Sequence, residues 1–336
     1  MHILPKRRRS SGPVHIARAL SEQIAQLNDP NCEKKTDKLL RSIEKHLEYA
    51  RHILCDVDDS HQLFDKTNPV SKLSTEFAYA RVLPLLITNL HQLTFESKKK
   101  VSLIFINLMK RKIGFRSPAA EVVQKNPGML MEMLEGYECP EIAPFCGIML
   151  RECSRHEPLA RALLETDQFY NLFTYIETPS FEISADAFST FKSLMQNCKR
   201  LSSNYLQSNY ERFFSYFQIL LTSDNYLTRR QALKLLSELL KEELNEKVAE
   251  RFVADVQHLK QIMWMLKDDS SLIRTEAFEI FKIFLDHPKR SPAVNQILVK
   301  NREKLVMFVD EFLNVAKGDA SAKRDKQAVL EKINRI

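Results

Sequence analysis

The chain has 336 residues, 44% of them hydrophobic, with a formal net charge of +7 and a pI near 9.0. This length alone would suggest about two globular domains. The charge permits acidic partners, but 50 basic and 43 acidic side chains are mostly interspersed, as on an ordinary solvated surface. No apolar run of about 18 residues occurs, so we expect no membrane-spanning helix, and the amino terminus lacks the apolar core of a signal peptide.

The first 12 residues are rich in basic side chains, and we expect them to form a disordered tail. The basic run from Lys6 to Arg9 is followed by Ser10 and Ser11. This combination also fits a phosphorylation site or a nuclear-localisation patch, although a solvated chain start explains it equally well.

Residues 13–53 are expected to form two helices, separated by a break at 28–31. The acidic stretch at 56–59 resembles a calcium-binding loop only superficially. His61 and Thr67 stand where such a loop needs Gly and a bidentate Glu, so we interpret the stretch as a turn.

The next segment also has helical periodicity. Residues 71–93 predict helices with a break near Pro84, and 94–112 predict a further helix. We expect residues 119–135 to be helical. Pro140 is expected to open the following helix, because proline suits the first turn.

The most informative stretch is 183–198, whose apolar residues trace one stripe of an α-helix. The stripe recurs at spacings of 45, 41, 45 and 45 residues along the chain. The recurring positions are Val101, Phe105, Leu108 and Met109; Ile142, Cys146, Leu150 and Cys153; Ile183, Ala187, Phe188, Phe191, Leu194, Met195 and Cys198; Ala232, Leu233, Leu236, Leu239 and Leu240; Ile273, Ala277, Phe278, Phe281, Phe284 and Leu285.

This period predicts an all-α fold, an armadillo/HEAT-like right-handed α-solenoid of stacked helical repeats. One repeat cannot bury its apolar stripe alone, whereas stacked repeats bury each other's and leave a concave face. A β-propeller has a similar period but needs frequent turns, and the chain has only 6 Gly.

The remaining elements follow the same pattern. We expect connecting helices at 158–176, an aromatic-rich core at 201–221, a long helical stretch at 294–314, a flexible break at 317–323 and a terminal helix at 327–333. The predicted domains are a tail at 1–12, a repeat domain at 13–314, and a linker with a capping helix at 315–336.

The six cysteines include no CxxC pair. Cys146 and Cys153 stand seven residues apart, which predicts one buried helical face rather than a metal site. We therefore expect no metal and no cofactor. Reduced thiols in a core favour a cytoplasmic protein, with the nucleus or polarity sites as alternatives.

Four blocks of sequence carry a family resemblance: KIGFRSP at 112–118, GIMLRECSRHEPLAR at 147–161, DAFSTFK at 186–192 and NYLTRRQ at 225–231. With these blocks in this order, the chain resembles the calcium-binding protein 39 family, also called mouse protein twenty-five or Hym-like, over roughly 13–335. The resemblance implies a helical-repeat scaffold without catalysis of its own. Such scaffolds bind sterile-twenty-class kinases or pseudokinases (STRAD-like), hold them in a closed, active-like state, and assemble polarity and energy-signalling complexes. A monomer is the default expectation for a solenoid with an exposed groove.

Residues 225–241, plotted at 100° per residue, have a polar stripe opposite the core arc. The stripe consists of Tyr226, Arg230, Lys234, Ser237 and Lys241. An aromatic ring followed by cations suits an acidic or aromatic partner, although a solvated face is the alternative interpretation. The resemblance implies that a concave, kinase-binding face is lined by Phe181, Tyr226, Arg230 and Lys234.

Met263 and Lys300 form a second candidate group. A methionine in this apolar context is usually core, but the resemblance implies a pocket for a partner's C-terminal Trp-Glu-Phe tail. Methionine can wrap an indole, and Lys300 can pair with a carboxylate. The chain departs from animal family members at Trp264, where they carry a small polar residue, and around Glu243 and Glu246, where they carry Arg and Phe. Both departures bear on which partner is bound.

Two other classes of function were weighed. A solenoid that carries cargo or binds nucleic acid is the alternative, motivated by the net charge and the run from Lys6 to Arg9, and a salt titration of duplex binding would reveal it. We expect no nucleic-acid partner, since no recognised module is present. An enzyme is not expected, because the sequence lacks a phosphate-binding Gly-rich loop, GxSxG and HExxH. The nearest acid–base pair, His156 and Glu157, is interpreted as capping or packing.

Overall fold

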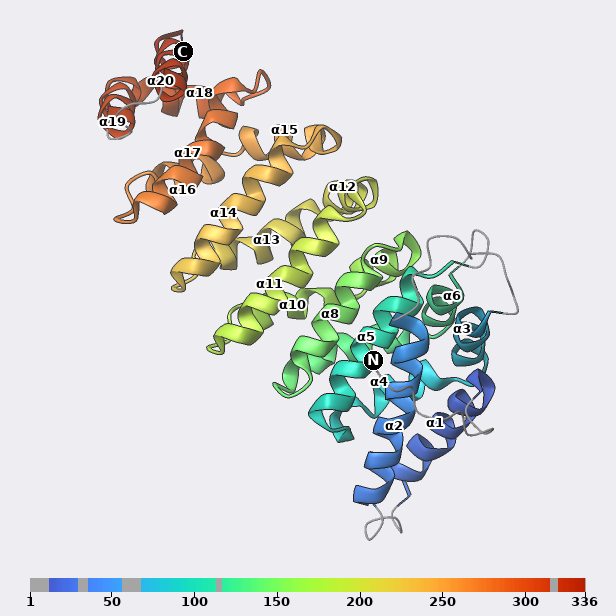
Figure 1. The fold of residues 1–336 in the computed structure, drawn as a ribbon. Coiled ribbons are helices and arrows are strands. Elements are labelled where there is room, and N and C mark those ends of the chain that lie inside the picture. Colours follow the sequence, from blue (N-terminus) through green and yellow to red (C-terminus); the bar gives the residue numbers. More distant parts are fainter. Residues whose placement is uncertain (1–11, 30–35, 56–67, 113–116, 315–319, 336) are drawn as a thin grey trace. The chain divides into compact units, whose positions relative to one another are not determined.

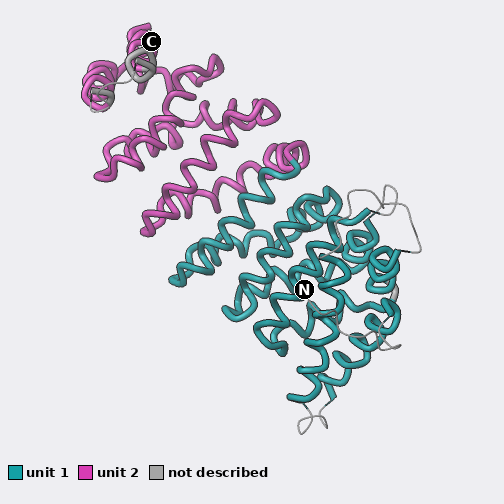
Figure 2. The backbone as a smooth tube through the Cα atoms, viewed as in Figure 1, with its two compact units in different colours: residues 1–198 teal, residues 199–336 magenta. Residues whose placement is uncertain are grey.

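A computed structural model describes residues 12–29, 36–55, 68–112, 117–314 and 320–335, and these residues form helices and turns without any β-strand (Figure 1). The predicted all-α class is therefore confirmed. The chain divides into two compact units, residues 1–198 and 199–336 (Figure 2). The basic tail at 1–11, the turn at 56–67 and the start of the break at 317 lie outside the described residues. The division into domains predicted from the sequence stays a prediction.

The helices of unit 1 are mostly short and are joined by tight turns. In chain order they are α1 (Pro13–Leu27), α2 (Thr36–Cys55), α3 (Pro69–Tyr79), α4 (Val82–Thr88), α5 (Phe95–Lys110), α6 (Pro118–Lys125), α7 (Gly128–Glu135), α8 (Ala143–Cys153), α9 (Glu157–Leu164), α10 (Asn171–Ile176) and α11 (Phe181–Gln196). Short 3-10 turns lie at Leu90–Gln92, Gly136–Glu138 and Asp167–Tyr170.

Four helices of unit 1 stack side by side in chain order: α2 contacts α5, α5 contacts α8, and α8 contacts α11 (Figure 1). Their contacting faces are the predicted apolar stripes. Phe105 on α5, Leu150 on α8 and Phe191 on α11 are fully buried. Burying one such side chain contributes about 1.5–3 kcal/mol, so the repeated stripe holds the stack together. The predicted stacking of helical repeats is thus confirmed.

Unit 2 continues with longer helices. They are α12 (Lys199–Ser208), α13 (Tyr210–Leu221), α14 (Tyr226–Lys241), α15 (Glu246–Ala254), α16 (Val256–Met265), α17 (Ser271–Asp286), α18 (Pro292–Lys300), α19 (Arg302–Asn314) and α20 (Ala320–Arg335), with a 3-10 turn at Glu243–Asn245. α14 packs along α17, and α17 in turn contacts α20. The aromatic core expected at 201–221 is present, since Phe213, Phe214 and Phe217 are buried.

The break predicted near Pro84 is present, but it falls just before the proline, which is itself helical. Pro84 lies in the first turn of α4, where its missing N–H would have no helical partner in any case. The break falls at Ala80 and Arg81, and Arg81 has a left-handed φ of 52°.

The segment 119–135 is helical as predicted, and it forms two helices because Pro127 follows Asn126 at a turn that separates α6 from α7. A prediction at the next proline needs correction. Pro140 does not open α8, which begins at Ala143 with Pro144 as its early proline.

The C-terminal predictions also shift. The stretch 294–314 is split at Asn301 into α18 and α19. The terminal helix begins at Ala320, seven residues before the predicted 327, and ends at Arg335. Alanine and basic residues have high helix propensity, so they extend the helix towards its start. The few apolar residues of this segment did not indicate this extension.

A polar network joins α8 to α11 inside unit 1. The Tyr137 hydroxyl donates to Asp186 Oδ2 at 2.7 Å, and Arg151 donates to Asp186 Oδ1 at 2.8 Å and to Thr190 at 3.0 Å. Burial, together with the charge of Asp186, raises the pKa of Tyr137. Gly147 allows this approach, since a Cβ at that position would lie 1.7 Å from Asp186 Oδ2.

A charge cluster joins α2 to α5. Glu48 accepts a hydrogen bond from Arg51 at 2.7 Å and lies 3.2 Å from Lys100, which also pairs with Glu44 at 3.1 Å. The hydrogen bond from Arg51 and, to a smaller extent, the interaction with Lys100 lower the pKa of Glu48 to about 2, against burial, which raises it.

Because the pKa of Glu48 is lower in the folded protein, its contribution to stability is present above its unfolded value and is lost as pH falls towards 2. We expect Glu48→Gln to lose less stability than the unaltered protein when acidified through this window. Urea denaturation at a series of pH values measures this difference. Glu22→Gln, an exposed change on α1, serves as the control. If the free energy of unfolding depends on pH in the same way for Glu48→Gln and the unaltered protein, the lowered pKa of Glu48 is contradicted.

Candidate functional site

The stripe predicted on residues 225–241 lies on α14, whose start is fixed by a side-chain cap. Asn225 Oδ1 accepts hydrogen bonds from the backbone N–H groups of Leu227 and Thr228, at 2.9 and 3.4 Å. This cap places Tyr226 at the first position of the helix, with 38% of its surface exposed. Arg230 and Lys234 follow at successive turns, so the three side chains share one face of α14.

One member of the predicted stripe is misplaced, because Ser237 is buried, with 6% of its surface exposed. A serine side chain is small enough to be buried against a neighbouring helix, whereas the long, charged side chain of a lysine stays in solvent. The exposed part of the stripe therefore consists of Tyr226, Arg230, Lys234 and Lys241, which we call the α14 stripe.

The charges of the α14 stripe are partly balanced by α17. Arg230 Nε lies 3.8 Å from Glu276 Oε1, and Lys241 Nζ donates to Glu279 at 2.7 Å. Burial raises the pKa of Glu279, but hydrogen bonds from Lys241 and Lys282 outweigh it and lower the pKa overall. The cations of the α14 stripe therefore lie beside acidic side chains of α17, which the sequence analysis did not consider.

Lys234 and Tyr226 differ from their neighbours on the α14 stripe. Both are exposed, and within the described part of the chain neither side chain has a hydrogen bond or ion pair. A lysine without an internal partner can pair with an external carboxylate without first breaking an existing contact.

Phe181 is the fourth residue predicted for the kinase-binding face. It is the first residue of α11 in unit 1, and 65% of its surface is exposed. Tyr226, Arg230 and Lys234 belong to unit 2. All four side chains are exposed or half-exposed within their own units. That they lie together on one concave face stays a prediction.

The second predicted group lies in unit 2. Met263 is half-buried on α16, and Lys300 is exposed at the end of α18, a helix that contacts α16. Trp264 points outward, with 67% of its surface exposed, which is rare for an indole. An exposed side chain of this size can narrow a neighbouring pocket.

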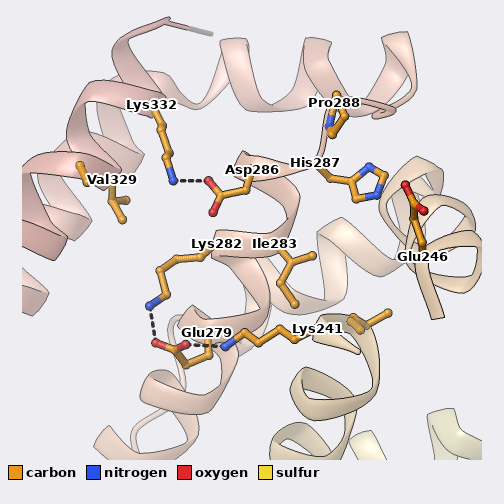
Figure 3. Close-up of a pocket in the computed structure, with 12 residues that line it drawn as sticks. Lys241, Glu246, Glu279, Lys282, Ile283, Asp286, His287, Pro288, Val329 and Lys332 are labelled. Atoms are coloured by element: carbon orange, nitrogen blue, oxygen red, sulfur yellow. Dashed lines mark hydrogen bonds and ion pairs between the residues drawn. The ribbon is translucent and has the colours of Figure 1, made fainter. Parts of the chain in front are cut away.

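Of the residues in these two groups, only Lys241 lines a cavity that lies elsewhere in unit 2. A cavity of about 630 Å³ lies between the C-terminal halves of α14 and α17 and the helix α20 (Figure 3). Its lining residues are Leu240, Lys241, Glu246, Glu279, Lys282, Ile283, Asp286, His287, Pro288, Ala328, Val329 and Lys332. We call it the α20 pocket.

The sequence analysis missed two features. Phe95, the first residue of α5, has 67% of its surface exposed and contacts Phe145 edge-on, with ring centroids 5.7 Å apart. It precedes Phe181 by 86 residues, the sum of the 45- and 41-residue repeat spacings, so the repeat register could have found it. The α20 pocket had no comparable signal, because charged residues form half of its lining.

His156 precedes α9 and makes no side-chain capping hydrogen bond, so of its two predicted roles packing fits and capping does not. It is half-buried, and burial lowers its pKa, although Glu152 raises it. Its neighbour Glu157 pairs with Arg161 at 3.0 Å.

The cysteines behave as core residues. Cys146 and Cys153 are buried as predicted, and burial raises the pKa of Cys146 to about 12. The described residues contain no group of three or more His, Cys, Asp or Glu side chains placed to hold a metal ion. Within the same residues, no helix has both the length and the apolar character needed to cross a membrane.

Stacked helical repeats define this chain as a helical-repeat protein, and the α14 stripe is an exposed, partly unpaired polar face on it. Comparison with known families identifies the family. The family model described as Mo25-like matches residues 3–336, and the chain belongs to this family. This result confirms the resemblance found in the sequence.

The relatives extend over nearly the whole chain. The mouse protein "Calcium-binding protein 39-like" is 38% identical over 321 residues, which cover 96% of this chain and 94% of that protein. "MO25-like protein 2" of Caenorhabditis elegans is 39% identical over 304 residues, covering 90% and 89%. Among solved structures, a designed armadillo repeat protein in complex with the peptide (KR)4 has a TM-score of 0.46 and 14% identity, covering 79% of this chain and 99% of that one.

Proposed function

We propose that this protein is a non-catalytic scaffold that binds and allosterically activates a sterile-twenty-class kinase or pseudokinase. The α14 stripe is the principal contact, and Phe181 adds a contact from unit 1. The observation that carries the proposal is the exposure of Tyr226 and Lys234 without internal partners, in a chain of the Mo25 family.

The proposed contact has three parts. Tyr226 and Phe181 supply aromatic area, which dominates the energetics of protein interfaces. Lys234 pairs with a carboxylate of the kinase. Arg230 exchanges its 3.8 Å pair with Glu276 for a closer one on the partner, which costs little because that internal pair is long and half-exposed.

Activation requires the scaffold to bind one kinase conformation better than another. A scaffold that binds the closed, active-like state more tightly shifts the population towards it by its differential affinity. A coupling of about 1–3 kcal/mol corresponds to roughly 5- to 150-fold. No reacting group on the scaffold is needed for this effect.

Calorimetry with a purified sterile-twenty-class kinase domain tests the binding step. We expect saturable, one-to-one binding by the full chain. Absence of measurable heat and of co-migration in size-exclusion chromatography would remove the proposal.

The second group is proposed to hold a partner's C-terminal tail. Met263→Ala is expected to weaken binding of a peptide ending in Trp-Glu-Phe about tenfold, because the loss of a central apolar contact at an interface costs more than 1 kcal/mol. Isothermal calorimetry with that peptide is the measurement.

Met307→Ala is the matched control for this substitution. Met307 is also in unit 2, on α19, and 71% of its surface is exposed, so its truncation should leave tail binding unchanged. Wild-type affinity in Met263→Ala would place the tail elsewhere.

A further inference from the structure

The α20 pocket lies entirely within unit 2 and has three walls. α14 contributes Leu240 and Lys241, and α20 contributes Ala328, Val329 and Lys332. α17 contributes Glu279, Lys282, Ile283 and Asp286. α17 contacts both other helices, which fixes the walls relative to one another.

Most charges of the pocket are already paired with each other. Glu279 accepts from Lys241 at 2.7 Å and lies 2.5 Å from Lys282, and Lys332 pairs with Asp286 (Figure 3). These pairs join α14 to α17 and α17 to α20. The polar wall is therefore organised before any ligand arrives, and a ligand need not order these side chains.

Glu246 is the exception among the charged groups of the pocket. It is exposed at the start of α15, and it has no hydrogen bond or ion pair with any described residue. Figure 3 shows it at the end of the pocket where His287 and Pro288 lie, away from the paired lysines. A hydrogen bond to Glu250 and, to a smaller extent, the charge of Glu246 raise the pKa of Lys289. Glu246 and Lys289 form no salt bridge, so this end of the pocket carries a carboxylate without a hydrogen-bonded partner among the described residues.

Apart from His287, the rest of the lining is apolar. Leu240, Ile283, Val329 and Pro288 line the pocket together with Ala328, whose single methyl group leaves space at the α20 wall. A volume of about 630 Å³ exceeds what one water molecule needs and is large enough for a bulky side chain.

We propose that the α20 pocket is a recognition site for a protein segment in which a large apolar side chain lies next to a basic one. The apolar side chain enters between Ile283 and Val329, and the basic group pairs with Glu246. This inference rests on the proposed function, because it assigns the segment to the same kinase that contacts the α14 stripe.

The position of Lys241 supports that assignment. It belongs both to the α14 stripe and to the lining of the pocket. From Lys234 to Lys241 the helix rises about 10 Å, so a partner lying along α14 reaches the pocket within three or four residues of extended chain. The pocket thus extends the proposed contact rather than forming a remote site.

The test fills the pocket without removing any contact. Ala328 is exposed on α20, so Ala328→Trp places an indole in the open space. The matched control is Gln327→Trp, an exposed change on the same helix turn that is not part of the lining. Binding of a purified sterile-twenty-class kinase domain is measured by calorimetry with the full chain. We expect Ala328→Trp to weaken binding about tenfold and Gln327→Trp to leave it unchanged.

A second pair of variants tests the charge. Glu246→Gln is expected to weaken the same binding about threefold at low salt and less at high salt, because exposed pairs are screened. Glu303→Gln removes an exposed carboxylate of α19 that is not part of the pocket lining, and it should have no effect.

The outcomes separate this inference from the proposed function. If the unaltered protein binds no kinase domain, the proposed function fails and this inference fails with it. If the unaltered protein binds and Ala328→Trp binds equally well, only the pocket assignment is overturned. A dimer of the unaltered chain that Ala328→Trp dissolves in sedimentation would also overturn it, because the occupant would be a second copy.

Discussion

Replacing Gly147 by Ala is expected to lower the free energy of unfolding by about 3 kcal/mol or more. The added Cβ would lie 1.7 Å from Asp186 Oδ2 and 2.5 Å from the Tyr137 hydroxyl. Neither atom can simply rotate away, because Arg151 and Thr190 hold both in the same hydrogen-bonded network. Relief of the clash therefore separates α8 from α11 or leaves a buried charge without its partner.

Urea denaturation followed by circular dichroism measures this loss. Gly128→Ala is the control, since a Cβ there meets nothing within 4 Å and the residue is exposed at the start of α7. That change should be neutral or stabilising by up to about 1 kcal/mol. Equal stability of the two variants would show that the network does not hold the two helices together.

Removing both cations of the α14 stripe, with Arg230→Ala and Lys234→Ala, is expected to weaken kinase binding by at least about 100-fold. Lys234 has no described partner inside the protein, and Arg230 has only the 3.8 Å pair with Glu276. The fold should therefore survive, with an unfolding midpoint close to that of the unaltered protein. Calorimetry with a sterile-twenty-class kinase domain measures the binding.

Loss of net charge alone could weaken binding, so the control removes the same charge elsewhere. Lys247→Ala with Lys260→Ala changes two exposed lysines of α15 and α16 in the same unit. This control should bind as the unaltered protein does. Binding retained by the α14 variant, or lost equally in both, would contradict the role of the α14 stripe.

The apolar periodicity predicted the core well because burial follows the helical period directly. On α11, all six apolar stripe residues from Ile183 to Met195 are buried. Cys198 is only half-buried, because the helix ends at Gln196 before reaching it. Proline positions were less informative, since Pro84 fits a helix start as well as a break.

The charges of the candidate site could not be predicted in the same way. Arg230 meets Glu276 and Lys241 meets Glu279 only because α14 packs along α17 in a particular register. Helical geometry places Arg230 on an exposed face, but it does not show which residues of the next helix lie opposite. The burial of Ser237 has the same origin, because a neighbouring helix covers it.

The α20 pocket shows the same limit more strongly. Its walls come from three helices separated by up to about 90 residues in sequence, from Leu240 to Lys332. Terminal residues such as Ala328 carry too weak an apolar pattern to predict even the start of α20. Tertiary packing therefore creates this site, and only coordinates reveal it.

The central claim is that the scaffold changes the activity of a kinase by binding it. The most direct test titrates the full chain into a purified sterile-twenty-class kinase domain and measures the rate of phosphoryl transfer to a peptide. We expect a saturable increase of roughly 5- to 150-fold, with half-saturation at the calorimetric Kd. For a partner that is a pseudokinase, the same titration follows the activity of its associated kinase. A rate that does not change once binding is saturated would contradict the account.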